Sequence, residues 1–270
     1  MEFTDKQYDG KFEVSKIEIH NQGEIIRGIL YFPPNKFLKP YPLIMYFHEF
    51  PQLISFQNII RDYKYLLEMG YAFLIFNFRG YRLSEGELSL RSQVSDGLSV
   101  CEFVKKMADK NIFNLDDINI IANDLGAYIA LLVTHKTDLI NRLLLISPII
   151  DLEKHVFQED FKRVLEYIKK FLPTSIRGID DIQEFINSTK EEISENHLNL
   201  NQVAEKLQYD RFKIIIGEVD KITPLKEVNF LVKTQHKDLI LIVIKDMDHE
   251  PFEDHEFEKI KSEIKLFFSR

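Results

Sequence analysis

The chain has 270 residues, of which 45% are hydrophobic, 12% aromatic and 29% charged. This is an ordinary composition for a globular protein, and the length suffices for one domain with a sizeable core. The formal net charge of −8 argues against a nucleic-acid partner and against docking on anionic lipid. No apolar run approaches the roughly 20 residues of a membrane span. The first residues lack a basic region followed by an apolar stretch, so we expect no signal peptide. With Cys101 as the single cysteine, we expect a cytoplasmic monomer or homodimer without membrane association.

Short β-rich runs alternate with helical patterns along the chain, which is typical of a mostly parallel sheet covered by helices. The first two runs, 12–20 and 24–31, are separated by Asn21-Gln22-Gly23, which favours an antiparallel hairpin. The remaining predicted strands are 42–47, 72–78, 117–121, 142–146, 212–216 and 239–244. The predicted helices are 56–69, 92–110, 126–135, 224–235 and 256–268.

The stretch 151–210 has no convincing strand and reads as polar helical sequence. An excursion of that length between two core strands is rarely a structureless loop. We therefore predict a core formed by residues 1–150 and 212–270, and a helical lid insertion at 151–211.

The stretch 120–128 (IIANDLGAY) follows a β run and opens a helix, which is the setting of a nucleophile elbow. Such a tight turn needs small residues around it, and Ala122, Gly126 and Ala127 meet that need. Asp124 stands at the nucleophile position, where free helix N–H groups favour negative charge. Taken alone, Asp124 fits a plain helix N-cap equally well.

Two later loops supply the partners that a nucleophile requires. Asp220 follows the apolar run 214–216, and His249 follows the apolar run 241–244. Nucleophile, acid and histidine in this order, each just after a strand, are typical of an α/β-hydrolase. Asp246 and Asp248 are alternative acids, and His255 is a weaker candidate base. No metal-ligand spacing or phosphate-binding loop is visible, so the sequence predicts neither a metal nor a cofactor.

Nearly the whole chain resembles the α/β-hydrolase superfamily, especially the cinnamoyl/feruloyl esterases and acyl-peptidase-like serine hydrolases. The similar motifs are 28–34 (GILYFPP), 47–51 (FHEFP) and 77–86 (NFRGYRLSEG). The resemblance implies an eight-stranded, mostly parallel sheet flanked by helices, with Asp124, Asp220 and His249 at the triad positions. It also implies an oxyanion hole formed by the backbone N–H groups of Phe50 and Leu125.

The sequence departs from the serine-hydrolase pattern at several positions. Asp124 replaces the serine, Glu49 replaces the oxyanion-loop glycine, Ala122 replaces the first elbow glycine, and Arg82 stands at another common glycine position. Two carboxylates at one site, Glu49 and Asp124, are expected to raise at least one pKa. We expect His48, Glu49 and Tyr167 to line the pocket.

Two explanations fit an elbow aspartate. In the first, Asp124 is a nucleophile, as in the similar haloalkane dehalogenases and epoxide hydrolases, and His249 then activates water to hydrolyse the ester intermediate. The chain has no tryptophan to cradle a halide. Tyr167 and Tyr209 are the candidate lid tyrosines of an epoxide hydrolase. Attack on an ordinary acyl ester would give an anhydride, which makes simple esterase chemistry least attractive.

In the second explanation, the fold has lost catalysis and serves as a ligand-binding or structural protein, with the Asp124 carboxylate blocking the oxyanion hole. Because an acid and a histidine still stand at both partner positions, the sequence favours a hydrolase of a small organic substrate such as an ester or epoxide.

Overall fold

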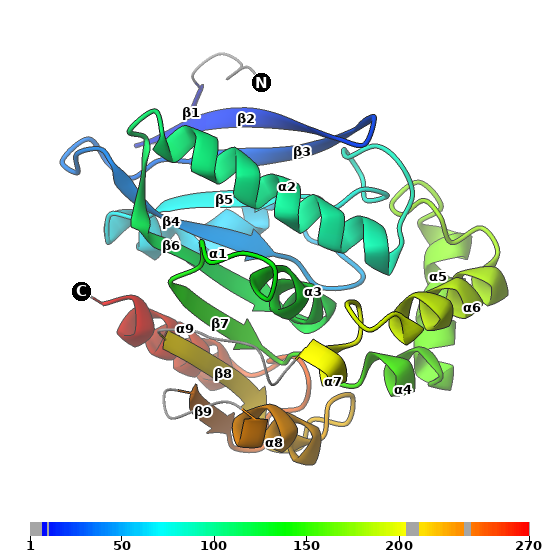
Figure 1. Cartoon of the computed structure of the whole chain (residues 1–270). Coiled ribbons are helices and arrows are strands. Elements are labelled where there is room, and N and C mark those ends of the chain that lie inside the picture. Colours follow the sequence, from blue (N-terminus) through cyan, green and yellow to red (C-terminus); the bar gives the residue numbers. More distant parts are fainter. Residues whose placement is uncertain (1–6, 10, 204–210, 235–238, 270) are drawn as a thin grey trace.

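The computed structural model describes residues 7–9, 11–203, 211–234 and 239–269 (Figure 1). Within these residues, nine strands form a single sheet in the order β1-β2-β3-β5-β4-β6-β7-β8-β9. The strands are β1 (Gln7–Asp9), β2 (Phe12–Asn21), β3 (Glu24–Tyr31), β4 (Tyr41–Phe47), β5 (Ala72–Phe76), β6 (Phe113–Asn123), β7 (Arg142–Ile146), β8 (Arg211–Gly217) and β9 (Leu239–Ile244). The predicted fold class is confirmed, and all eight predicted strands are present. The short edge strand β1 is an addition.

The sheet is antiparallel at one end and parallel through the remainder. β2 pairs antiparallel with β1 and β3, and β3 pairs antiparallel with β5. The predicted hairpin is confirmed, because Asn21 pairs with Glu24 across the turn. From β5 to β9 every neighbouring pair is parallel. The carboxyl ends of β4, β6, β7, β8 and β9 therefore lie along one edge of the sheet.

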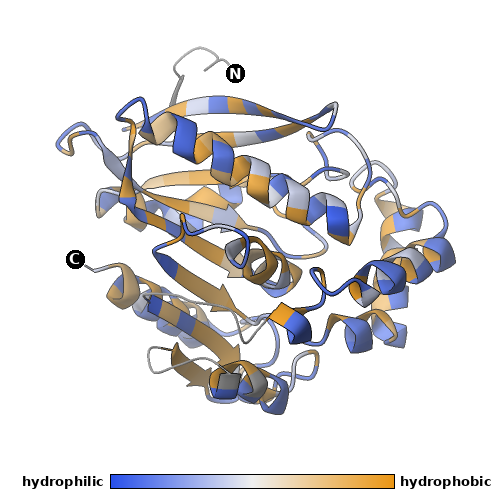
Figure 2. Cartoon of the chain, in the orientation of Figure 1, coloured by the Kyte–Doolittle hydropathy of each residue, from blue (hydrophilic) through white to orange (hydrophobic). Residues whose placement is uncertain are grey.

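Helices cover both faces of the sheet. Alternate residues of β4 show this, since Leu43, Met45 and Phe47 belong to one buried cluster and Ile44 and Tyr46 to the other. The first cluster includes α2 (Leu90–Ala108), α3 (Asp124–Thr134) and α8 (Leu225–Thr234). The second includes α1 (Phe56–Glu68) and α9 (Asp254–Phe268). The parallel strands are mostly apolar, polar and apolar residues alternate along β2, and α2 carries polar residues between its apolar ones (Figure 2).

The described part of the stretch between β7 and β8 contains four helices and no strand. They are α4 (Leu152–Val156), α5 (Glu159–Phe171), α6 (Ile182–Ser194) and α7 (Leu200–Val203). In Figure 1 these helices lie beyond the carboxyl ends of β6 and β7. Phe161, Leu165 and Ile168 of α5 are buried against the first cluster, which docks this stretch on the rest of the protein. Tyr209 lies outside the described residues.

No helix within the described residues is long and apolar enough to span a membrane.

Candidate active site

Asp124 stands on a sharp turn between β6 and α3. Its φ is +49°, a left-handed conformation that non-glycine residues seldom adopt. Such strain persists only where the surroundings enforce it, and it is typical of functional turns. Asn123 occupies the N-cap position and makes no side-chain capping bond, while Asp124 is the first residue of the helix. The alternative interpretation of Asp124 as a helix N-cap is therefore wrong.

The turn is tight because α3 packs directly on the end of β4. A Cβ atom added to Gly126 would lie 2.3 Å from the carbonyl oxygen of His48 and 2.5 Å from that of Phe47. Ala122 and Ala127 are fully buried on either side. The small residues of the elbow thus allow the close approach that places Asp124 next to the loop after β4.

The Asp124 carboxylate lies between a backbone donor and a histidine. Its Oδ2 accepts a hydrogen bond from the Phe50 backbone N–H at 2.9 Å, and its Oδ1 lies 3.2 Å from His249 Nε2. A hydrogen bond from the Leu125 backbone N–H also lowers the pKa of Asp124. The two backbone groups expected to form an oxyanion hole therefore both act on the same carboxylate.

Asp220 holds the other side of the His249 ring. Its side chain is fully buried, and its Oδ2 lies 2.9 Å from His249 Nδ1. The Oδ1 atom accepts hydrogen bonds from the backbone N–H groups of Ile222 at 2.9 Å and Thr223 at 2.7 Å. These bonds fix the carboxylate, which in turn orients the imidazole toward Asp124.

The alternative acids and the second histidine lie elsewhere. Asp248 accepts hydrogen bonds from the backbone N–H and the ammonium group of Lys221, at 3.1 and 2.8 Å. The Asp246 side chain forms a 3.9 Å ion pair with Lys245, and both side chains are exposed. His255 is exposed in the first turn of α9. The structure therefore brings together Asp124, His249 and Asp220 only, out of the triad candidates.

Charge dominates the chemistry of this cluster. Burial opposes the charged form of His249, but hydrogen bonds to Asp124 and Asp220, with their negative charge, raise its pKa to about 10. Burial also opposes the charged form of Asp124, yet its hydrogen bond to His249 and the charge of that ring leave the Asp124 pKa lowered. At neutral pH the site therefore holds an imidazolium between two carboxylates.

His48 is a buried support of the loop after β4. Its Nε2 accepts a hydrogen bond from the Phe78 backbone N–H at 3.2 Å, so its Nδ1 carries the proton and donates to the Glu49 carbonyl oxygen at 2.9 Å. Burial lowers the pKa of His48 to about 4, which keeps the ring neutral. Because both nitrogens are bonded to backbone groups, His48 shapes the loop and does not line the pocket described below.

Glu49 turns away from the pocket toward a buried polar cluster. Tyr46 donates a hydrogen bond to Glu49 Oε2 at 3.1 Å and accepts one from Asn123 Nδ2 at 2.7 Å. Burial raises the pKa of Glu49, and the charges of Asp124 and Glu250 raise it further. Burial is thus the main cause of the raised Glu49 pKa, and the neighbouring Asp124 carboxylate adds to it. Glu49 is not among the residues that line the pocket described below.

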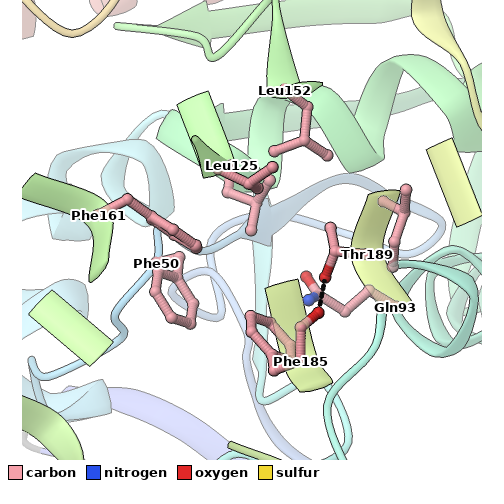
Figure 3. Close-up of a pocket in the computed structure, with 9 residues that line it drawn as sticks. Phe50, Gln93, Leu125, Leu152, Phe161, Phe185 and Thr189 are labelled. Atoms are coloured by element: carbon pink, nitrogen blue, oxygen red, sulfur yellow. Dashed lines mark hydrogen bonds between the residues drawn. The ribbon is translucent and has the colours of Figure 1, made fainter. Parts of the chain in front are cut away.

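The pocket next to the elbow is small, partly open to solvent and mostly apolar (Figure 3). Its lining comes from the β4 loop, the elbow, α2 and the helices between β7 and β8, and consists of Phe50, Leu90, Gln93, Leu125, Leu152, Val156, Phe161, Phe185 and Thr189. The pocket begins at Phe50 and Leu125, whose backbone N–H groups act on Asp124.

Tyr167 does not contribute to this pocket. Its side chain is 54% exposed on α5 and packs against Phe171, with ring centroids 5.0 Å apart. Tyr167 is thus not among the residues that line this pocket, because the amphipathic helix turns its ring to solvent and buries Phe161 and Leu165 instead.

His155 is a site neighbour that the sequence does not single out. It shares one face of α4 with Leu152 and Val156, which line the pocket, and its ring lies 4.9 Å from that of Phe161. Its Nδ1 is buried without a hydrogen-bond partner. Burial lowers the pKa of His155, the charge of Asp124 raises it and that of His249 lowers it. A histidine in a short polar helix gives no signal that would have identified it beforehand.

No group of three or more histidine, cysteine, aspartate or glutamate side chains among the described residues has the arrangement of a metal site.

Comparison with known proteins identifies the family. A sequence model of the alpha/beta hydrolase fold matches residues 42–179, which is just over half of the chain. The chain belongs to the α/β-hydrolase family, and the predicted resemblance is confirmed. No curated protein sequence matches it.

Solved structures of esterases share the fold. Acetyl xylan esterase from Paenibacillus sp. R4 superposes with a TM-score of 0.70 at 14% identity, covering 98% of this chain and 88% of that one. Acetyl xylan esterase 1 from Thermoanaerobacterium sp. JW/SL YS485 gives 0.69 at 13%, covering 99% and 88%. Est1E from Butyrivibrio proteoclasticus with bound ferulic acid gives 0.70 at 18%, covering 93% and 97%. At these identities the similarity establishes the fold.

Proposed function

We propose that this protein is a hydrolase of small organic substrates in which Asp124 is the nucleophile and His249, oriented by Asp220, is the base. The observation that carries the proposal is the position of the Asp124 carboxylate, held on a strained elbow between the Phe50 N–H and the His249 ring. Helices α4 to α7, within the stretch 151–211, act as a lid that covers the substrate. The preferred substrates are epoxides and related compounds with an electrophilic alkyl carbon.

The first half of the reaction makes an ester on the enzyme. One oxygen of Asp124 attacks the alkyl carbon, and the carbon–oxygen bond of the substrate breaks with its electron pair on the departing oxygen. The carboxylate charge disappears as the ester forms. The attraction that raises the His249 pKa to about 10 is thereby weakened, and the imidazolium releases its proton to neutralise the departing oxygen.

The second half hydrolyses that ester. Neutral His249 takes a proton from water, and the resulting hydroxide attacks the Asp124 carbonyl carbon while the backbone N–H groups of Phe50 and Leu125 stabilise the oxyanion. The alkoxide leaves with the proton from His249. The Asp124 carboxylic acid then returns its own proton to His249, which restores the resting ion pair.

The rival proposal is a non-catalytic pocket protein in which the Asp124 carboxylate blocks the oxyanion hole. The contact with Phe50 N–H fits both proposals. Two observations favour catalysis. The Glu49 side chain, which would fill the site of an inactivated enzyme, points to Tyr46, and a pocket begins beside Phe50 and Leu125.

The test compares wild type with Asp124→Ala and Asp124→Ser on aryl esters, epoxides and haloalkanes. We expect wild type to hydrolyse the epoxides, Asp124→Ala to lose turnover by at least a thousandfold, and Asp124→Ser to gain activity on aryl esters, because a serine there meets an intact histidine and oxyanion hole. Wild type inert toward every class would contradict the proposal. Epoxide turnover that persists in Asp124→Ala would show that another residue is the nucleophile.

A further inference from the structure

The pocket beside the elbow has one polar side chain without a partner. Gln93, in the first turn of α2, is only 4% exposed and lines the pocket. Its backbone N–H bonds to the Ser89 carbonyl oxygen. Among the described residues, the Gln93 side-chain amide forms no hydrogen bond with the protein. Its nitrogen and oxygen are also not among the fully buried polar atoms that lack a partner, so they remain accessible from the pocket. The amide therefore faces the empty space of the pocket.

Thr189 accompanies Gln93 at this end of the pocket (Figure 3). Its hydroxyl donates a hydrogen bond to the Phe185 carbonyl oxygen at 2.8 Å, so its own oxygen keeps acceptor capacity. The rest of the lining is hydrocarbon or aromatic, from Leu90, Leu152, Val156 and Phe161. Gln93 and Thr189 thus form one hydrogen-bonding end of an otherwise apolar pocket.

The other end of the pocket is the catalytic elbow. Phe50 and Leu125 lie on one side of the close-up, and Gln93 and Thr189 lie on the other (Figure 3). A molecule whose reacting carbon meets Asp124 and whose body enters this pocket beside Phe50 and Leu125 can bring its far end toward Gln93. The geometry therefore relates the amide to the part of the substrate most distant from the reaction.

A polar amide that opens into an otherwise apolar pocket is available to hydrogen-bond a ligand or a water molecule. Native pockets use a few placed polar groups in an apolar lining to select their ligands. We propose that Gln93 hydrogen-bonds a hydroxyl or carbonyl group at the far end of the substrate. The substrate class is thus a compact, mainly aromatic or branched aliphatic molecule, electrophilic at one end and polar at the other. This inference rests on the proposed function of Asp124.

The test uses a matched pair of aryl epoxides that differ only in a hydroxyl group on the ring, para to the epoxide. We expect wild type to prefer the hydroxylated epoxide by about tenfold in kcat/KM, the effect of one neutral hydrogen bond. Gln93→Leu, which keeps the volume and removes the amide, should abolish that preference, mainly through KM. Gln183→Leu, an exposed glutamine on α6, is the control and should retain it. Gln93→Met replaces Gln93→Leu if the latter fails to fold.

The outcomes separate this inference from the proposed function. Turnover of both epoxides with the same preference in wild type and Gln93→Leu would overturn the role of Gln93 and leave Asp124 as the nucleophile. If wild type turns over neither epoxide, the proposed function fails. Calorimetric binding of 4-ethylphenol and ethylbenzene then decides. A preference for the phenol that Gln93→Leu loses supports the inference, and equal binding, as expected if the amide holds only water, overturns it.

Discussion

The charges of Asp124 and His249 depend on each other. The imidazolium lowers the Asp124 pKa, and the carboxylate keeps the imidazolium protonated well above the ordinary pKa of histidine. This reciprocity gives the site a proton in its resting state and a base once Asp124 is esterified. The same pair in a serine hydrolase would have a neutral nucleophile and a neutral histidine.

Replacement of Asp124 by asparagine tests this coupling without a substrate. Asparagine keeps the shape of the side chain but removes its charge, so the His249 pKa should fall substantially from about 10. Titration of the ring by NMR measures it. Asp62→Asn, on the exposed surface of α1, should leave the His249 pKa where it is. A His249 pKa equal in Asp124→Asn and wild type would mean that Asp124 does not set the charge of the ring.

At the scale of elements, the site depends on how closely α3 approaches β4. Gly126 lies against the carbonyl oxygens of Phe47 and His48, and this approach places the Phe50 N–H on the Asp124 carboxylate. A glycine also allows close packing between the loop that carries Asp220 and the loop that carries His249. A Cβ atom on Gly217 would lie 2.2 Å from the carbonyl oxygens of Met247 and Asp248. Two glycines therefore bring the three loops of the site together.

Gly126→Ala should destabilise the protein by about 3 kcal/mol, because its methyl group would overlap backbone atoms of Phe47 and His48, which can shift only if the strand or the helix moves. Gly23→Ala, with a φ of +89° but open space around it, should cost about 1 kcal/mol from backbone strain alone. Urea denaturation of both variants gives the two free energies of unfolding. Equal costs would show that the β4–α3 approach is looser than described.

A buried ion pair ties α2 to the loop after β5. Asp96 is fully buried and accepts hydrogen bonds from the Arg79 backbone N–H at 2.7 Å, from Arg79 Nε at 2.9 Å and Nη2 at 2.7 Å, and from Asn21 Nδ2 at 2.8 Å. Asp96→Ala leaves the guanidinium buried without its partner and should cost about 3 to 5 kcal/mol of unfolding free energy. Asp62→Ala, which loses only an exposed contact to Arg61, should barely change it. A small effect of Asp96→Ala would mean that water replaces the carboxylate.

At the scale of the whole molecule, the sequence predicts the fold well because buried strands and amphipathic helices have distinct periods. The strands 24–31, 142–146 and 239–244 agree with the structure to the residue. β6 is longer than expected, since it includes Phe113–Asp116, where Asn114 and Asp116 interrupt the apolar run and Phe113 pairs with Tyr41. β1 was not predicted, because three residues carry too little signal.

The order of motifs along the chain also predicts which loops meet, and the structure brings Asp124, His249 and Asp220 into contact. Side-chain directions within the helices between β7 and β8 were not predictable in the same way. Tyr167 and His155 both lie on amphipathic helices, and only tertiary packing decides that the first faces solvent while the second lies near Asp124. The sequence likewise gives no indication that Gln93 lines the pocket, because only tertiary packing decides which face of α2 is turned to it.

Global stability should depend on pH through His249. Its folded pKa of about 10 exceeds the ordinary value of 6.5, so its stabilising contribution is complete below pH 6.5 and is lost as the pH rises toward 10. The difference in unfolding free energy between wild type and His249→Gln should therefore shrink across that interval. Urea denaturation at several pH values measures it, and a difference that does not vary with pH would mean that the folded and unfolded pKa values are alike.

The central claim is that Asp124 forms an ester with the substrate, and isotope labelling tests it most directly. A single turnover of an epoxide by excess enzyme in H₂¹⁸O should yield product whose new oxygen is ¹⁶O, donated by Asp124. Mass spectrometry should then find ¹⁸O in the peptide that contains Asp124, because water attacks the carbonyl carbon of the ester. Product labelled with ¹⁸O in the first turnover, with an unlabelled Asp124 peptide, would mean that water attacks the substrate directly and would contradict the account.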